Sequence, residues 1–164
     1  MYQKILVPLD GSSLAESALP YVEALAATHN AEIVLLQVVV DPIYDLLLTG
    51  PKLATATEDH LFSQRAITQR YLDCLASRCT EKGIRARTMI SEGIVADKIL
   101  DCARRVEADL IVLTNHGFNS PSQWKLGNVT YRLLHDSEIP VLLIRSKQPS
   151  FKELKPALSV TPVN

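Results

Sequence analysis

The chain has few of the residues that mark cross-linked, membrane-spanning or nucleic-acid-binding proteins. Only three of its 164 residues are cysteines, and an odd number with no close pair argues against a disulfide framework. The formal net charge is −1, so no excess of positive charge attracts DNA, RNA or an acidic membrane surface. No apolar run approaches the roughly 20 residues that a membrane-spanning helix needs. We therefore expect a cytoplasmic protein with no nucleic-acid or membrane partner.

What the sequence does contain is the composition of one globular domain. Hydrophobic residues make up 47% of the chain and charged residues 21%, and the length suffices for one domain with a buried core. The last stretch holds Pro149, Pro156 and Pro162 and shows no clear period. We predict a domain over residues 1–146, followed by a tail over 147–164 that is mobile or docks on a partner.

Short apolar segments alternate with stretches of helical period along this domain. The predicted strands are 5–9, 33–40, 84–90, 108–114 and 139–145, and the predicted helices are 13–29, 58–82, 93–106 and 128–135. Most of the strands are apolar throughout, as expected of strands covered on both faces, whereas 84–90 partly alternates and is expected near an edge. The order predicts the α/β class: a single open five-stranded parallel sheet with helices on both faces, a Rossmann-like three-layer sandwich.

Signals for helix ends accompany this pattern. Either Ser12 or Ser13 can serve as the N-cap of the first helix, which is expected to continue to His29. Gly83 is placed to adopt the left-handed conformation that ends the helix over 58–82. Residues 41–57 have no regular period and are expected to form a flexible excursion.

The carboxyl ends of the strands are where an open α/β sheet binds ligands. Asp10 follows the first strand, and its carboxylate can accept a hydrogen bond from a ribose hydroxyl or help to hold a divalent cation. Gly117 and Gly127 let the backbone approach an anion with no Cβ in the way. The helix after Gly127 offers unpaired N–H groups and the positive end of its dipole, which suit phosphate. The pattern predicts a site for a phosphorylated ligand.

Further groups belong to the same edge, and simpler roles stay open for some of them. Asn128 and Thr130 add side-chain donors, and the backbone of Val38 can meet the edge of a base. Asp10 can instead merely start a turn and cap the first helix, and the two glycines can serve turns alone. His116 has no serine or cysteine partner beside it in the sequence, which favours a loop role beside phosphate over catalysis.

In these segments the chain resembles the universal stress protein family. The resemblance rests on residues 4–12, 113–117, 126–129 and 139–145 and covers about 1–146. The ATP-binding branch of that family has Gly, two residues, Gly, nine residues, Gly and then Ser or Thr. Here Gly117 and Gly127 keep the spacing, whereas Thr114 stands in the first glycine position and Asn128 in the last position.

The resemblance implies an adenine nucleotide (ATP, ADP or AMP), with or without magnesium, and a stress-response or regulatory role with little or no catalysis. Asp10 would face the ribose, Val38 the adenine, and Thr114, Gly117 and residues 127–130 the phosphates. The implied nucleotide-binding set is Pro8, Leu9, Asp10, Val38, Val39, Leu113, Thr114, His116, Gly117, Gly127, Asn128, Val129 and Thr130. No metal site of the chain's own is expected, although Asp10 can reach magnesium bound to the nucleotide.

The resemblance also implies a homodimer that forms through the fifth strand, with Val141, Leu142, Leu143 and Ile144 at the paired edge. An apolar edge strand without charges is otherwise prone to aggregate. Two other functions stay open. One is a slow magnesium-dependent ATPase that uses Asp10 and His116, and the other is a dimeric interaction module whose glycine loops no longer bind nucleotide.

Overall fold

The computed structural model describes residues 1–40, 58–115 and 126–145. Its strands are β1 (Lys4–Leu9), β2 (Glu32–Val39), β3 (Ala86–Glu92), β4 (Leu110–Thr114) and β5 (Val141–Ile144). Its helices are α1 (Ser13–Glu16), α2 (Leu19–His29), α4 (Glu58–Glu81), α5 (Val95–Arg105) and α6 (Asn128–Asp136). The expectations for 41–57, His116, Gly117 and the tail lie outside the described residues.

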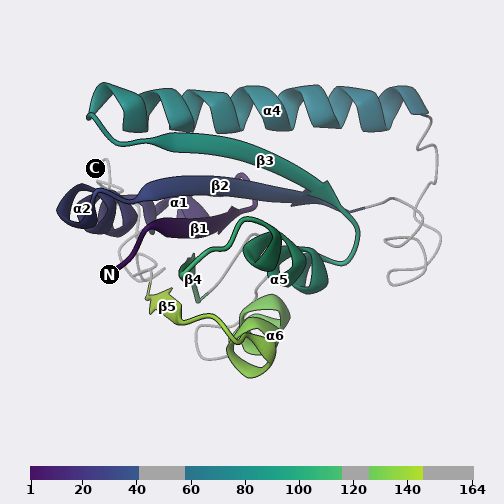
Figure 1. The fold of residues 1–164 in the computed structure, drawn as a ribbon. Coiled ribbons are helices and arrows are strands. Elements are labelled where there is room, and N and C mark those ends of the chain that lie inside the picture. Colours follow the sequence, from purple (N-terminus) through teal and green to yellow (C-terminus); the bar gives the residue numbers. More distant parts are fainter. Residues whose placement is uncertain (41–57, 116–125, 146–164) are drawn as a thin grey trace, which may run out of the picture.

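The strands form one parallel sheet in the order β3-β2-β1-β4-β5 (Figure 1). From β1 the chain first builds outward through β2 to β3, and then returns to the other side of β1 to build β4 and β5. The order of the strands therefore reverses between β1 and β4. This arrangement confirms the predicted fold class.

The sheet separates two apolar cores, because alternate residues of each strand point to opposite faces. In β1, Ile5 and Val7 belong to the core beneath α1, α2 and α4, whereas Leu6 belongs to the core beneath α5 and α6. All three side chains are fully buried. Figure 1 shows α4 along one side of the sheet and α5 and α6 on the other.

The first helix differs from its prediction, because it is two helices rather than one. Pro20 lies in the first turn of α2. A proline there has no N–H to donate and its ring clashes with the carbonyl four residues earlier, so a helix cannot run through it undisturbed. The chain therefore closes α1 after a single turn at Glu16 and starts again at Leu19. Ser12, not Ser13, caps α1: its Oγ accepts from the Ala15 N–H at 3.1 Å.

The structure confirms the expected end of the long helix and the expected edge strand. Gly83 has a φ of 74°, in the left-handed region that favours glycine. β3 then forms one edge of the sheet, although it begins at Ala86 rather than at Ile84.

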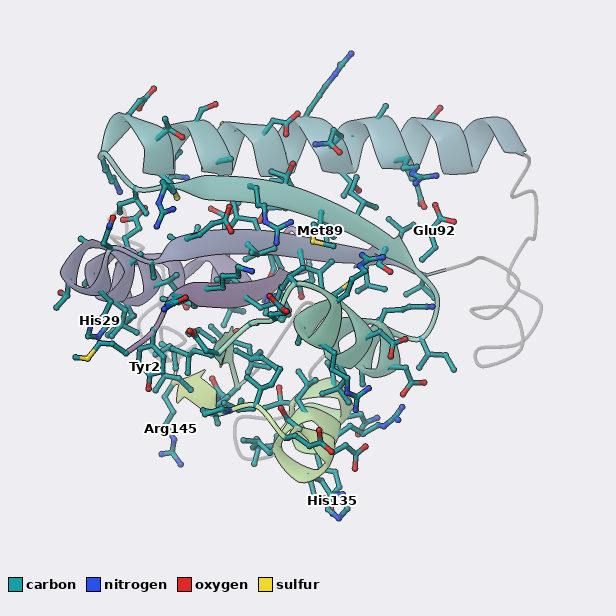
Figure 2. All side chains as sticks on the ribbon, viewed as in Figure 1. Tyr2, His29, Met89, Glu92, His135 and Arg145 are labelled. Carbon is teal, nitrogen blue, oxygen red and sulfur yellow. The ribbon has the colours of Figure 1, made fainter. Side chains whose placement is uncertain are left out.

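Side-chain contacts fix the amino-terminal edge of the sheet. Backbone N–H groups of Gln3 and Lys4 donate to the carboxylate of Asp109, the second at 3.3 Å. Tyr2 meets His29 in the last turn of α2 edge-on, with ring centroids 5.5 Å apart (Figure 2). None of the helices in the described part of the chain combines the length and apolar character needed to cross a membrane.

The two-core arrangement predicts a large cost for truncating Ile99, which is 1% exposed at the centre of the core under α5. Ile99→Ala should lower the free energy of unfolding by about 2–5 kcal/mol, because it removes buried surface and leaves a cavity. Ile67→Ala is the matched control, since Ile67 on α4 is 67% exposed, and it should change the free energy by less than about 0.5 kcal/mol. Urea unfolding measures both values, and equal losses would contradict this account of the core.

Candidate functional site

Parallel pairing brings the sequence-predicted positions Asp10, Val38 and Thr114 to within one residue of the same level at one end of the sheet. Leu9 is opposite Gln37 of β2, so the next pair along is Asp10 and Val38. On the other side Leu6 is opposite Ile111 of β4. Continuing this register brings Leu9 beside Thr114, with Asp10 and Asn115 next. The carboxyl ends of β2, β1 and β4 thus lie side by side where the strand order reverses, which is where open α/β sheets bind ligands.

The carboxylate of Asp10 is held by the turn that follows β1. Oδ1 accepts from the Ser12 N–H at 3.0 Å and from the Ser12 hydroxyl at 2.6 Å. The Ser12 oxygen in turn caps α1. The turn-forming role left open for Asp10 is therefore real, because an aspartate that bonds the backbone two residues on is the usual way to start such a turn. The same bonds fix the direction of an exposed carboxylate at the switch in strand order.

Two hydrogen bonds attach the start of α6 to the end of β4. The Gly127 N–H donates to the Asn115 carbonyl at 3.3 Å. The hydroxyl of buried Thr130 donates to the Thr114 carbonyl at 3.3 Å. The amino-terminal end of α6, with the positive end of its dipole, thus lies directly beside the end of β4. Because the Thr130 hydroxyl donates its hydrogen here, we assign Thr130 the role of holding α6 in place.

Gly127 is unusual among the described glycines. Gly11, Gly83 and Gly93 all have positive φ, which is a sufficient reason for glycine. Gly127 has a φ of −60°, which any residue can adopt. Among the described residues, a Cβ built there would meet nothing closer than the Asn115 carbonyl oxygen at 3.8 Å, an ordinary contact. Neither the backbone nor the described atoms around it therefore require glycine at the N-cap of α6.

The predicted site residues differ in their exposure to solvent. The exposed or half-buried ones are Pro8, Asp10, Val38, Gly127, Asn128 and Val129, and the buried ones are Leu9, Val39, Leu113, Thr114 and Thr130. Leu9 and Leu113 have their side chains in the two apolar cores. His116 and Gly117 lie outside the described residues, and within the described ranges no three His, Cys, Asp or Glu side chains gather as metal ligands.

Two residues that support the site were not singled out from the sequence. Ser12 was considered only as a helix cap, although the order Asp, any residue, Ser is the signal for a turn in which the aspartate bonds the serine. Asn115 contacts α6 through its backbone carbonyl, and no side-chain pattern in the sequence reveals such a contact.

The pKa of Tyr71, in α4, is affected by carboxylates in and near the Asp10 turn. Burial raises the pKa of Tyr71 well above its usual range, and the negative charges of Glu16 and Asp10 raise it further, while Arg78 acts in the opposite direction. The Tyr71 hydroxyl oxygen is buried. The carboxylates at the end of β1 and in α1 thus act on a group in the long helix.

This raised pKa predicts how stability depends on pH in the alkaline range. In the unfolded chain Tyr71 ionises near pH 10, whereas in the folded protein it stays neutral, so its contribution is fully present below about pH 10 and is lost above it. Tyr71→Phe should therefore lose less unfolding free energy than the parent between about pH 9 and about pH 11. The exposed Tyr21 gives the control Tyr21→Phe. Equal slopes for the parent and Tyr71→Phe would refute the placement of this hydroxyl.

Relatives of the chain are similar to it in both sequence and fold. Universal stress protein MJ0577 of Methanocaldococcus jannaschii is 28% identical over 159 residues, covering 90% of this chain and 97% of the relative. The solved structure of that protein superposes with a TM-score of 0.76 over 90% of this chain and 99% of the other. The universal stress protein UspA from Lactobacillus plantarum is 28% identical, with a TM-score of 0.72 over 88% of this chain and 98% of the other.

More distant members with the same fold have been solved with nucleotides. One is a universal stress protein in complex with cAMP, at 23% identity and a TM-score of 0.60. Another is an Arabidopsis thaliana member with AMP bound, at 20% identity and a TM-score of 0.61. The model of the universal stress protein family matches residues 1–145, a span that includes every described residue. This chain therefore belongs to the universal stress protein family.

Proposed function

We propose that this chain binds an adenine nucleotide at the carboxyl ends of β2, β1 and β4, and that it acts as a regulatory or stress-response protein rather than as an efficient enzyme. The observation that carries the proposal is Gly127. It is a glycine that neither its φ nor its described neighbours demand, at the amino-terminal end of a helix. A phosphate that approaches the N–H groups of that helix would need the space that a side chain at this position would occupy.

The register of the strands supports a particular placement of the base, the ribose and the phosphates along the edge of the sheet. Val38, Asp10 and the end of β4 lie on neighbouring strands, so a base, a ribose and phosphates laid across them would meet each in turn. The carboxylate of Asp10, which is fixed by Ser12, would accept a hydrogen bond from a ribose hydroxyl. The phosphates would reach Gly127 and Asn128 at the start of α6. Magnesium would arrive with the phosphates, and the carboxylate of Asp10 is of the right chemistry to contact it.

The cAMP- and AMP-bound members of the family support an adenine nucleotide as the ligand class. For this chain, Thr114 and Asn128 occupy two positions where the ATP-binding pattern has other residues. We expect these two changes to decide which of ATP, ADP and AMP binds best. A mass spectrum of small molecules released from freshly purified protein identifies the nucleotide that is carried from the cell.

Substituting Gly127 separates the role of this residue in binding from a role in folding. Gly127→Ala should leave the unfolding midpoint nearly unchanged, because the backbone and the space admit a methyl group. It should weaken ATP or AMP binding about tenfold, equivalent to about 1.4 kcal/mol, because the methyl group stands where the phosphate approaches. Isothermal titration calorimetry measures the affinity and thermal denaturation the stability.

The same titrations distinguish the alternatives. Asp10→Asn should also weaken binding, whereas Asp101→Asn on the exposed side of α5 should not. If neither ATP, ADP nor AMP binds at millimolar concentration, the chain is an interaction module instead. Phosphate release from ATP and magnesium that disappears in Asp10→Ala would make it a slow ATPase.

We further propose that the chain forms a homodimer through β5. This strand is the second edge of the sheet, consists of four apolar residues and has Leu142 37% exposed. Tyr131 and Leu134 of the neighbouring α6 are exposed as well. Pairing with a second copy would satisfy the free edge and cover the apolar side chains.

Charge at this edge should prevent dimer formation. Leu142→Lys should convert a dimer into a folded monomer, because two lysines would meet in the pair. Ile67→Lys, which changes an exposed apolar residue of α4, should stay dimeric. Light scattering after size-exclusion chromatography measures the mass, and a monomeric parent chain would refute the dimer.

A further inference from the structure

The outer edge of β3 presents backbone groups with no partner in the described part of the chain. The Ile33 N–H donates to the Arg85 carbonyl at 2.8 Å, and Ile33 is level with Ala86. In a parallel pair of this register, the odd-numbered residues of the β3 segment bond to β2. Ala86, Thr88 and Ile90 therefore direct their N–H and C=O groups away from the sheet. Long bare edges of this kind are normally covered or blocked.

A groove of about 720 Å³ runs beside this edge, between β3 and the carboxyl-terminal half of α4. Figure 1 shows the two elements side by side at the edge of the sheet. Three of its lining residues are small, namely Ala76, Ser77 and Ala86, which leaves room for a side chain from outside. The groove lies toward the start of β3, so it is separate from the nucleotide site proposed at the carboxyl ends of the strands.

Two carboxylates line the groove without a cation. Asp73 Oδ1 accepts from the Gln69 amide at 2.7 Å and the Thr88 hydroxyl at 3.2 Å, which are neutral donors. Glu81 has neither an ion pair nor a side-chain hydrogen bond to any described residue. Arg87 also lines the groove, but the two carboxylates outnumber its single positive charge, and a groove of net negative charge favours a positively charged guest.

Two basic residues, Arg87 in the lining of the groove and Lys82 next to Glu81, have carboxylate partners of their own. Arg87 has its Nε 3.4 Å from a Glu32 carboxylate oxygen. Lys82 pairs with Glu23 at 2.6 Å. Neither of these two residues can form an ion pair with Asp73 or Glu81 without breaking an existing pair.

We propose that the edge of β3 binds an extended peptide segment of a partner protein, and that a lysine or arginine of this segment enters the groove. The peptide would add a strand to the sheet through the free backbone groups of Ala86, Thr88 and Ile90. Side chains alternate along a strand, so a residue level with Thr88 would point to the same face as Thr88, toward Asp73.

A second copy of the chain suits this edge poorly. The residues of β3 that share the α4 face are Ala86, Thr88 and Ile90, none of which carries a positive charge. Pairing two copies of β3 would therefore leave the carboxylates unbalanced and bring the two acidic grooves together, and like charges oppose such contacts.

The test uses two fluorescent nine-residue peptides that alternate threonine and valine, one with a central lysine and its twin with a central glutamate. Fluorescence anisotropy with the full chain should show the lysine peptide binding about tenfold more tightly. Asp73→Asn and Glu81→Gln should each weaken it about fivefold, as expected for an exposed charge pair. Glu138→Gln removes an exposed charge between α6 and β5 and should have no effect.

Amide hydrogen exchange locates the peptide. On binding, the N–H groups of Ala86, Thr88 and Ile90 should exchange more slowly, whereas those of Arg87 and Met89, which already bond to β2, should not change. Ala86→Pro keeps both carboxylates and removes one outward N–H at the first residue of an edge strand, where proline is tolerated. It should reduce the affinity while the protein keeps its unfolding midpoint.

Several outcomes would overturn the proposal. These are equal binding of the two peptides, no binding at millimolar concentration, affinity unaffected by Asp73→Asn and Glu81→Gln, or exchange protection elsewhere on the protein. An oligomer that is lost in Ala86→Pro without any peptide would assign the edge to a second copy instead.

Discussion

The parallel pairing of β1 with β4 is the constraint on which the rest of the structure depends. It joins the part of the chain that builds outward to β3 with the part that builds outward to β5. At the carboxyl end of this pair the strand order reverses, which is where open α/β sheets bind ligands. The Asp10 turn and the start of α6 lie at this end, and the register of the pair sets their relative height.

The sequence predicted the sheet because its strands carry strong, continuous apolarity. It was less informative about the helical connection after β1. Apolar residues at Leu14, Ala18 and Val22 keep a helical period across the break, so the period alone hides the effect of Pro20. The start of β3 was also misplaced, because Ile84 is buried by packing in the turn after α4 and not as part of the strand.

For the candidate site, the sequence indicated which residue types belong at the strand ends but not how they are held. The double hydrogen bond from Ser12 to Asp10 and the bond from Thr130 to the Thr114 carbonyl join residues through particular atoms. The second of these spans 16 positions, and no local pattern encodes it. Equally, that Gly127 has an ordinary φ is visible only in the backbone, and it gives this glycine a different meaning from Gly83.

The division of the interior by the sheet has a consequence for how such a chain can change over time. Ile5 and Leu6 are neighbours in sequence, yet they belong to different cores, and only the backbone of β1 lies between them. Substitutions in one helical layer therefore have little mechanical effect on the other, since side chains without common contacts contribute almost independently to stability. The layer that holds α6 and the layer that holds α4 can each acquire new sequence, and new surface chemistry, while the common sheet stays the same.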